Sequence, residues 1–423
     1  MTHVDPTTRT TPGRWNRLIH PIGVSSSRWE RLAIAIAAGS MGTLGFSITS
    51  PLLPDLAEAL SVDAGAIGLV QAAVSVPGVL LSLLIGYFAD KVGRRRVVLV
   101  SLVLFSLAGA AGYLARSFSL LVAARLIQGI GTSGILGLSI VLVGDLFQGK
   151  ERTRAMGFNM AGLTAVNMAG PTLSGIVGRT DVFRPFLIFL IGIPLAMWVT
   201  RMPVEPARQA ESPLRHLGAA FRFVRRAGRV TDYVGILGAT VATTVLLHGF
   251  GYTTTPLYLD EVFGIESSGR GLIIAAFQVG TVIAAVQIGR LRARRSASSL
   301  VSLSLGLMAA GAIATAAAPT WWFVAVGLGV SGIGFGLWVP IAQEHTAEVG
   351  GDVYRGLTVL MWVTFVRVAQ VIGPPMGASM SESIGPRTTF LIAGVGMGLA
   401  MLAWRPVRTA ATRRFETAVR EAP

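Results

Sequence analysis

Long apolar segments alternate with short polar ones along most of the chain. Each apolar segment is close to the roughly 20 residues that an α-helix needs to cross a hydrocarbon layer about 30 Å thick. The pattern predicts twelve membrane-spanning helices, at residues 31–50, 65–88, 97–115, 119–145, 157–178, 184–202, 232–254, 271–289, 299–317, 321–343, 357–380 and 387–404. We therefore expect an all-α membrane protein.

The series of apolar segments is interrupted once, at residues 203–230. Pro203, Pro206 and Pro213 precede a run of arginines there, which is typical of a linker outside the membrane. The interruption divides the chain into a tail at 1–30, a six-helix bundle at 31–202, the linker at 203–230, a second six-helix bundle at 231–405 and a tail at 406–423. An apolar face within the linker fits either a helix lying on the anionic inner leaflet or a solvated linker helix.

Features of the first bundle recur about 200 residues later. The pair Gly170-Pro171 matches Gly373-Pro374 at an offset of 203, and Gly86 matches Gly289 at the same offset. Repeats of this kind are typical of transporters built from two related halves. We therefore expect two pseudo-symmetric six-helix bundles.

Composition and charge favour a membrane protein and argue against nucleic-acid binding. Hydrophobic residues make up 52% of the chain and charged residues 13%, whereas soluble proteins carry about 25% charged residues. The formal net charge is +15, but Lys and Arg cluster in alternate connections, and the other connections hold Arg116, Arg179, Arg184, Arg270 and Arg387. The positive-inside rule then places both termini in the cytoplasm. We expect a monomeric multi-pass protein of the cytoplasmic (inner) membrane, with the lipid bilayer and not nucleic acid as its partner.

Cysteine and histidine usage gives no sign of a metal or cofactor site. The chain has no Cys, and its five His residues are scattered, so no ligand spacing typical of a metal site is present. We expect no metal and no cofactor. A membrane enzyme would need a catalytic constellation and a channel would need repeated pore rings, and neither is found. A sensor that transports nothing stays open.

The predicted connection between the second and third helices carries the most specific motif. Residues 86–96 read Gly-Tyr-Phe-Ala-Asp-Lys-Val-Gly-Arg-Arg-Arg, which resembles the signature loop of the major facilitator superfamily. The resemblance implies a conformational latch made of Gly86, Asp90, Gly93, Arg94 and, from the end of the fourth helix, Asp145. The arginines also satisfy the positive-inside rule, and Asp145 also fits a plain surface carboxylate.

Arg125 lies inside the fourth predicted helix and shares one helical face with Gln128 and Thr132. A charge in the membrane is costly and is normally functional. The surrounding sequence resembles a second motif of the superfamily, whose Arg is associated with proton transfer. A structural Arg bonded to backbone carbonyls is the alternative.

The fifth predicted helix carries a strip of small residues around a proline. Gly162, Gly170, Pro171, Ser174 and Gly175 resemble the helix-packing motif of the family's antiporters, especially drug:proton exporters with twelve helices. Ser174 stands where the family usually has Gly. Close helix packing alone also accounts for such a strip.

In this fold a central cavity is expected between the two bundles. The seventh and tenth helices would contribute Thr244, Tyr252, Phe335 and Trp338, and the fourth and eleventh would contribute Gln128, Thr132 and Arg367. Walls of aromatic and weakly polar side chains suit a small amphipathic substrate. Threonines bonded to their own helix and aromatics packed in a core are the alternative.

Proton coupling needs a group that titrates and that is reached from each side in turn. No acid lies at the middle of a predicted helix. We therefore expect Asp55, Arg125 and His248 to form a relay in the outer half, with the proton gradient as the energy source.

These features together predict a secondary active transporter, first a proton-coupled exporter of multidrug or toxic compounds that works by alternating access. The alternative is a carrier of the same fold for an anionic metabolite or lipid, which the buried Arg367 favours.

Overall fold

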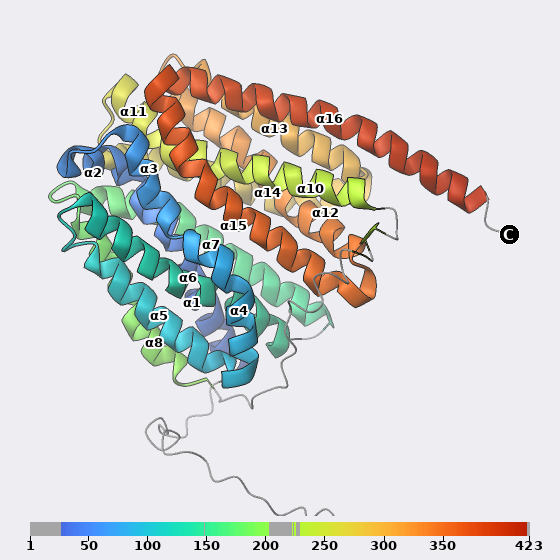
Figure 1. The fold of residues 1–423 in the computed structure, drawn as a ribbon, viewed down its shortest axis with the longest axis horizontal. Helices are drawn as coiled ribbons and strands as arrows, with labels where there is room; N and C mark the ends of the chain where they lie inside the picture. The colour runs from blue at the N-terminus through green and yellow to red at the C-terminus, as the bar shows by residue number, and fades with distance from the viewer. Residues whose placement is uncertain (1–26, 148, 203–221, 223, 226–228, 421–423) are drawn as a thin grey trace, which may run out of the picture.

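The structure is a computed structural model that describes residues 27–147, 149–202, 222, 224, 225 and 229–420. Helices make up nearly all of this part of the chain, and it contains no strand (Figure 1). The prediction of an all-α protein is therefore confirmed for the residues that are described.

The first half runs from Arg28 to Val199. Its elements are α1 (Arg28–Thr49), η2 (Ser50–Leu52), α2 (Leu53–Leu60), α3 (Ala64–Ala73), α4 (Val76–Val92), α5 (Arg94–Ala111), α6 (Phe118–Leu146), α7 (Gly149–Gly178), η3 (Arg184–Ile191) and α8 (Gly192–Val199).

The second half begins after the linker. Its elements are α10 (Val230–Val245), the π-helix η4 (Leu246–Thr254), α11 (Thr255–Phe263), α12 (Ser267–Arg294), α13 (Ala297–Ala316), α14 (Trp321–Val349), α15 (Gly351–Ile384) and α16 (Pro386–Arg420).

Local sequence sets several of the helix ends. Ser27, Ser117 and Ser296 each accept a hydrogen bond from a backbone N–H in the first turn of the helix that follows, which satisfies a donor that the helix itself leaves unpaired. Gly93 and Gly385 have φ angles of 98° and 79°, which side chains disfavour. These two glycines allow the abrupt turns from α4 to α5 and from α15 to α16.

Each of the twelve predicted ranges is mostly helical, with non-helical residues at 74–75, 112–115, 200–202 and 317. Within the described residues, nine helical segments are long and apolar enough to cross a membrane. The helices α5, α7 and the pair η3–α8 are not among the nine; α5 opens with three arginines, and η3 with α8 forms a shorter apolar helix. For this part of the chain, length and composition alone therefore support nine crossings.

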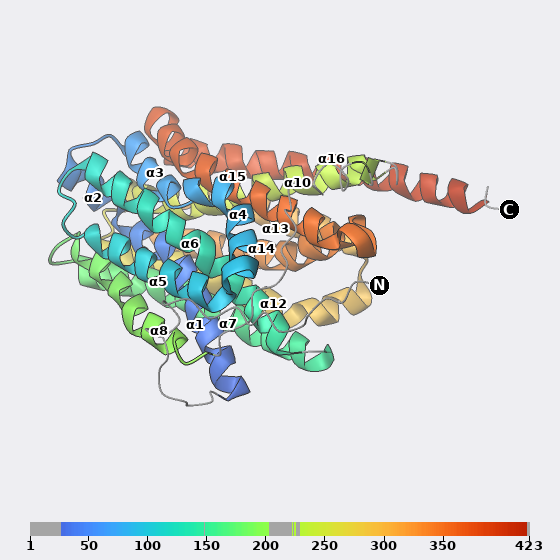
Figure 2. The same ribbon diagram turned by 60° about the horizontal axis from the view of Figure 1, so that its bottom comes forward.

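Each half has its own hydrophobic core. One cluster of buried apolar side chains draws on α1 to α8, with Leu257 and Ala378 added from the other half. The second cluster runs from Val224 to Met397. The two sets of helices lie side by side, and α2, α3 and α11 lie together at one end of the molecule (Figures 1 and 2).

The predicted linker and tails are only partly described. Most of 203–230 and the first 26 residues of the predicted tail at 1–30 lie outside the described residues. At the other end α16 continues as a helix to Arg420, so most of the range predicted as a tail at 406–423 extends the last helix.

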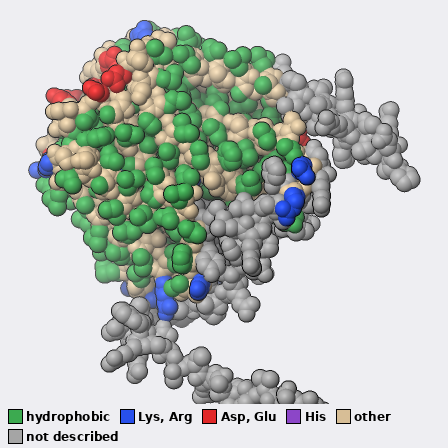
Figure 3. Space-filling model, in the orientation of Figure 1, with side chains coloured by type: hydrophobic (Ala, Val, Ile, Leu, Met, Phe, Trp, Pro, Cys, Tyr) green, Lys and Arg blue, Asp and Glu red, His purple; other side chains and the backbone are tan. Residues whose placement is uncertain are grey.

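The surface is that of a membrane protein. Figure 3 shows a face covered mostly by hydrophobic side chains, with Asp and Glu gathered over the region of α2 and α3 and most Lys and Arg at the opposite edges. Large apolar side chains such as Leu80, Leu114 and Val286 are 69% to 75% exposed, which in water would be a large unfavourable surface.

Candidate functional site

An ion-pair cluster joins the two halves at one end of the molecule. Arg270, in the first turn of α12, donates from Nη2 to both carboxylate oxygens of Asp55 at 2.6 Å and from Nη1 to Asp260 at 3.2 Å. Arg270 is 1% exposed, whereas Asp55 is 37% and Asp260 is 48% exposed. We call the end of the molecule that carries these three residues the closed end.

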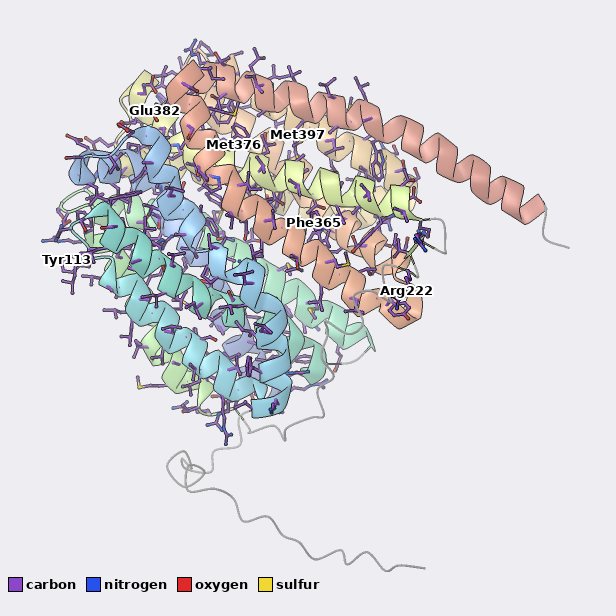
Figure 4. All side chains as sticks on the ribbon, viewed as in Figure 1. Tyr113, Arg222, Phe365, Met376, Glu382 and Met397 are labelled. Atoms are coloured by element: carbon purple, nitrogen blue, oxygen red, sulfur yellow. The ribbon has the colours of Figure 1, made fainter. Side chains whose placement is uncertain are left out.

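Other polar contacts cross between the halves at the closed end. The backbone N–H of Gly65 donates to Glu382 at 2.6 Å, and the hydroxyl of Ser267 donates to the carbonyl of Gly175 at 3.1 Å. Glu382 lies at the tip of α15, beside the start of α3 (Figure 4). These contacts tie α3 to α15 and α7 to α12.

Glycines let those two helix pairs approach at backbone distance. A Cβ on Gly68 would lie 2.6 Å from the carbonyl oxygen of Pro374, and a Cβ on Gly271 would collide with the carbonyl oxygen of Pro171. Both separations are too short for any real Cβ, so the two seams between the halves depend on these glycines.

The small-residue strip predicted in the fifth helix is thus divided between two contacts. Pro171 and Gly175 face α12 in the other half, whereas Gly162 and Gly170 face α1 in the same half. The hydroxyl of Ser174 donates to the carbonyl of Pro171 at 3.1 Å, so this side chain is satisfied within its own helix.

Arg125 is held entirely by the first half. It donates from Nε to the carbonyl of Val70 at 3.4 Å, from Nη1 to Gln128 at 2.6 Å, and from Nη2 to the carbonyl of Gly45. This is the geometry of a structural arginine. The predicted relay of Asp55, Arg125 and His248 requires Asp55 to lie near Arg125, but in this structure Asp55 lies against Arg270 instead.

His248 lies in η4, where the seventh predicted helix departs from α-helical geometry. The hydroxyls of Thr253, Thr254 and Thr255 donate to the carbonyls five residues earlier, those of His248, Gly249 and Phe250, at 2.8, 3.2 and 2.9 Å. Wide turns of this kind are frequent at functional sites. The π-helix places the His248 side chain toward α15.

A chain of polar side chains runs from His248 across to the first half. Gln370 accepts from Ser75 at 3.2 Å and from Arg367 Nη1 at 3.3 Å, and its amide nitrogen lies 3.1 Å from His248 Nε2. His248 Nδ1 lies 3.2 Å from the carbonyl of Thr244. A carbonyl only accepts, so Nδ1 carries the hydrogen and Nε2 accepts from Gln370. We use the name central polar chain for the five residues Ser75, Thr244, His248, Arg367 and Gln370.

Arg367 differs from Arg125 in how few of its donors are used. Its one hydrogen bond to a described residue is the bond to Gln370, although a guanidinium has five N–H donors. Gly78 lies opposite, and a Cβ there would be 3.3 Å from Arg367 Nε. Neither Arg125 nor Arg367 forms an ion pair with a side chain in the described part of the chain.

Several residues predicted to line the cavity contact residues of their own half in this structure. The hydroxyls of Tyr252 and Thr132 are bonded, the first by Gln278 at 2.8 Å and the second to the carbonyl of Gln128 at 3.1 Å. Trp338 is 1% exposed in the core of the second half, and Phe335 packs on Phe277 with ring centroids 5.7 Å apart. Trp338 is therefore a core residue in this structure and Phe335 packs half-buried against that core, and their place in a cavity wall stays a prediction.

The predicted latch is described only in part. Gly93 forms the turn before α5, and Arg94 is 9% exposed. Gly86, Asp90 and Asp145 lie in helices, but their side chains are outside the described residues. The latch itself stays a prediction.

Two residues of the site have no place in the sequence prediction. The sequence marks Arg270 only as a charge in a connection, and its partner Asp55 is 215 residues away. Gln370 lies three residues after Arg367, just as Gln128 lies three residues after Arg125. That shared Arg-x-x-Gln spacing places each pair on one helical face and is the signal that could have found Gln370.

Comparison with known proteins adds the family. Residues 35–269 and 240–422 match the model of the Major Facilitator Superfamily. The chain is 25% identical over 366 residues to the bacillibactin exporter of Bacillus subtilis (strain 168), covering 81% of this chain and 87% of that protein. It is 22% identical over 374 residues to multidrug resistance protein 2 of the same organism, covering 86% and 92%.

A solved structure shows the same fold. A crystal structure of a bacterial homolog to the human lysosomal transporter Spinster, in an inward-facing and unoccupied conformation, superposes with a TM-score of 0.75 at 16% identity and covers 92% of this chain and 99% of that one. The family match, the apolar helices and the two packed halves agree. The chain belongs to the major facilitator superfamily and is a multi-pass membrane transporter, not an enzyme.

Proposed function

We propose that the protein is a proton-coupled exporter of small amphipathic compounds that works by alternating access. The observation that carries the proposal is that the Gly170-Pro171 segment lies at the seam between the halves, where the carbonyl of Pro171 packs against α12. A packing motif at this seam acts on the movement of one half against the other. One relative above is named as a bacillibactin exporter and the other as a multidrug resistance protein, which supports efflux.

The proposal includes a topology of twelve crossings with both termini in the cytoplasm, in a monomer of the cytoplasmic membrane. Its support is the clustering of Lys and Arg in alternate connections. In this orientation the closed end faces outward. Opening to the outside then requires the bonds between Asp55 and Arg270 and between Gly65 and Glu382 to break, while the predicted latch forms at the other end.

The central polar chain is the proposed place of proton coupling. A proton on His248 Nε2 turns that atom from an acceptor into a donor, so Gln370 must rotate its amide and present its carbonyl oxygen instead. The rotated amide then directs its N–H groups toward Arg367 and Ser75. The bond to Arg367 is lost, and Ser75 of the first half, which donates to Gln370 in this structure, must accept instead. Proton binding is thereby linked to a contact between the halves. Asp55, at the closed end, is the proposed entry point for protons, and Arg125 positions the first half.

A reconstituted transport assay tests this proposal. Purified protein in liposomes is given an inward proton gradient and a panel of cationic, neutral and anionic amphipathic dyes. We expect gradient-driven dye transport that a protonophore abolishes and that His248→Gln removes. The control is His345→Gln, at the far end of α14, which should keep transport. Equal dye flux with and without the gradient would contradict proton coupling.

A second candidate is a carrier for an anionic metabolite or lipid. Arg367 favours it, because this buried arginine has a single hydrogen bond to the described residues. A paired probe separates the two candidates: anilinonaphthalene sulfonate is anionic, and phenylnaphthylamine is its neutral analogue. If the cargo is anionic, Arg367→Gln should weaken binding of the sulfonate by about tenfold, the effect of one charge-assisted hydrogen bond, and leave the neutral probe unchanged. Equal changes for both probes would exclude the anionic candidate.

A further inference from the structure

An apolar groove of about 1180 Å³ lies on the flank of the first half. It is lined by residues within 33–44 of α1, 162–173 of α7 and 188–201 of η3, α8 and the turn after α8. Gly162 and Gly170 bring α7 close to α1. The groove follows the side of α1 between α7 and α8, where its lining changes from half-buried residues at 33–37 to buried residues at 40–44. The groove is separate from the central polar chain and from the closed end.

The groove opens toward the surroundings of the protein. Leu173, Ile191 and Met197 on its walls are 47%, 55% and 62% exposed. In a membrane-spanning protein these side chains face lipid, and an apolar hollow at this depth offers water no partners. Hydrocarbon chains are what the groove can hold.

The length of the groove fits one leaflet of the bilayer. The stretch from Ala33 to Leu44 on α1 covers about 16 Å at the rise of an α-helix, close to half of a hydrocarbon core about 30 Å thick. A single acyl chain running beside α1 would therefore reach from the membrane surface to the middle of the bilayer.

The end of the groove nearest residue 201 is polar. The indole N–H of Trp198 donates to Glu30 at 3.1 Å, and Arg201 lies 3.7 Å from the same carboxylate with its side chain 62% exposed. Tryptophan is enriched where hydrocarbon meets head groups, and an exposed guanidinium is well suited to bind phosphate in a bidentate manner.

We infer that this groove binds a phospholipid, with an acyl chain beside α1 and the phosphate on Arg201. The inference needs only that the chain spans the bilayer; its assignment to the cytoplasmic leaflet rests on the topology in the proposed function. Arg201 and Glu30 place one charge of each sign beside the head group.

Photo-crosslinking tests the groove. The full chain is reconstituted with phosphatidylethanolamine or phosphatidylglycerol that carries a diazirine in one acyl chain, irradiated and mapped by peptide mass spectrometry. The control is an apolar face of α16 formed by Leu391, Val395 and Leu399, which are 46%, 49% and 61% exposed. We expect crosslinks on 33–44, 162–173 and 188–201 well above those on this control face.

Two pairs of variants complete the test. Ala165→Phe fills the groove and should lower its crosslinking to the level of the control face, whereas Ala161→Phe, exposed on α7 outside the groove, should not. Arg201→Gln should lower phospholipid occupancy by about tenfold, the effect of one charge-assisted hydrogen bond. Arg290→Gln, an exposed arginine on α12, is its control.

The inference is overturned if the groove is labelled no more than the control face of α16, or if Ala165→Phe and Ala161→Phe behave alike. Crosslinking does not require transport, so a protein that fails the dye assay can still pass this test. Labelling of one leaflet at a time tests the topology separately from the groove.

Discussion

Arg125 and Arg367 each lie three residues before a glutamine on the same helix, yet their surroundings differ. Arg125 places three nitrogens on acceptors of the first half, two of them backbone carbonyls. In the described part of the chain Arg367 uses one nitrogen, on Gln370. The sequence predicts that both charges are buried and costly. It does not predict which is saturated, because the backbone carbonyls that bind Arg125 have no signature of their own.

Replacing Arg125 with lysine tests the structural role. A single ammonium on a flexible stem does not reproduce the fork of the guanidinium, so Arg125→Lys should leave a buried acceptor unpaired. We expect the free energy of unfolding to fall by about 1–3 kcal/mol, measured as a lower thermal midpoint in detergent. Arg290→Lys, which is exposed, is the control and should leave the midpoint unchanged. An unchanged midpoint for Arg125→Lys would contradict the structural role.

At the scale of helices, apolar runs predict where helices occur but not how a helix is distorted. Thr244, His248 and Tyr252 are spaced by four, which predicts one stripe of an α-helix. The π-helix η4 begins at Leu246, so this spacing no longer keeps them on one stripe. The threonine hydroxyls that bond five residues back are ordinary in sequence, which is why the distortion escapes periodicity.

The close approach of α7 and α12 gives a prediction at the same scale. A leucine at Gly271 would collide with the Pro171 carbonyl, and overpacking of this kind costs about 1–3 kcal/mol. We expect Gly271→Leu to separate the halves at the closed end, seen as a longer distance between spin labels at Thr180 and Val262.

Gly238 supplies the matched control for that variant. A Cβ at Gly238 would meet nothing within 4 Å, so Gly238→Leu should leave the distance between the labels unchanged. If both leucine variants show the same distance between the spin labels as the parent protein, the seam does not depend on backbone contact at Gly271.

At the scale of the whole molecule, the two seams are related by the offset of 203 seen in the sequence. Gly68 against Pro374 corresponds to Gly271 against Pro171. The repeat of Gly-Pro is visible in the sequence, but its glycine partners are not, since they lie in other helices. The ion pair of Asp55 with Arg270 breaks this symmetry, because the related positions hold Tyr258 and Ile67.

That asymmetry makes Arg270 the residue to test for closure of the whole molecule. Arg270→Gln removes the charge that joins Asp55 and Asp260, and it leaves two carboxylates without their shared partner. Repulsion between like charges then favours separation of the halves. The chain contains no cysteine, so a single cysteine at Ser50, buried beside the seam, reports on opening. We expect a water-soluble maleimide to label it faster in Arg270→Gln.

An ion pair within one half supplies the control for this variant. Arg116 pairs with Asp181 at 3.5 Å inside the first half, so Arg116→Gln removes a salt bridge without touching the contact between the halves. The rate at which maleimide labels the cysteine at position 50 should then equal the rate in the protein that keeps Arg116. Equal rates in the two variants would mean that packing of the helices holds the closed end together, and that the pair of Arg270 with Asp55 contributes nothing to its closure.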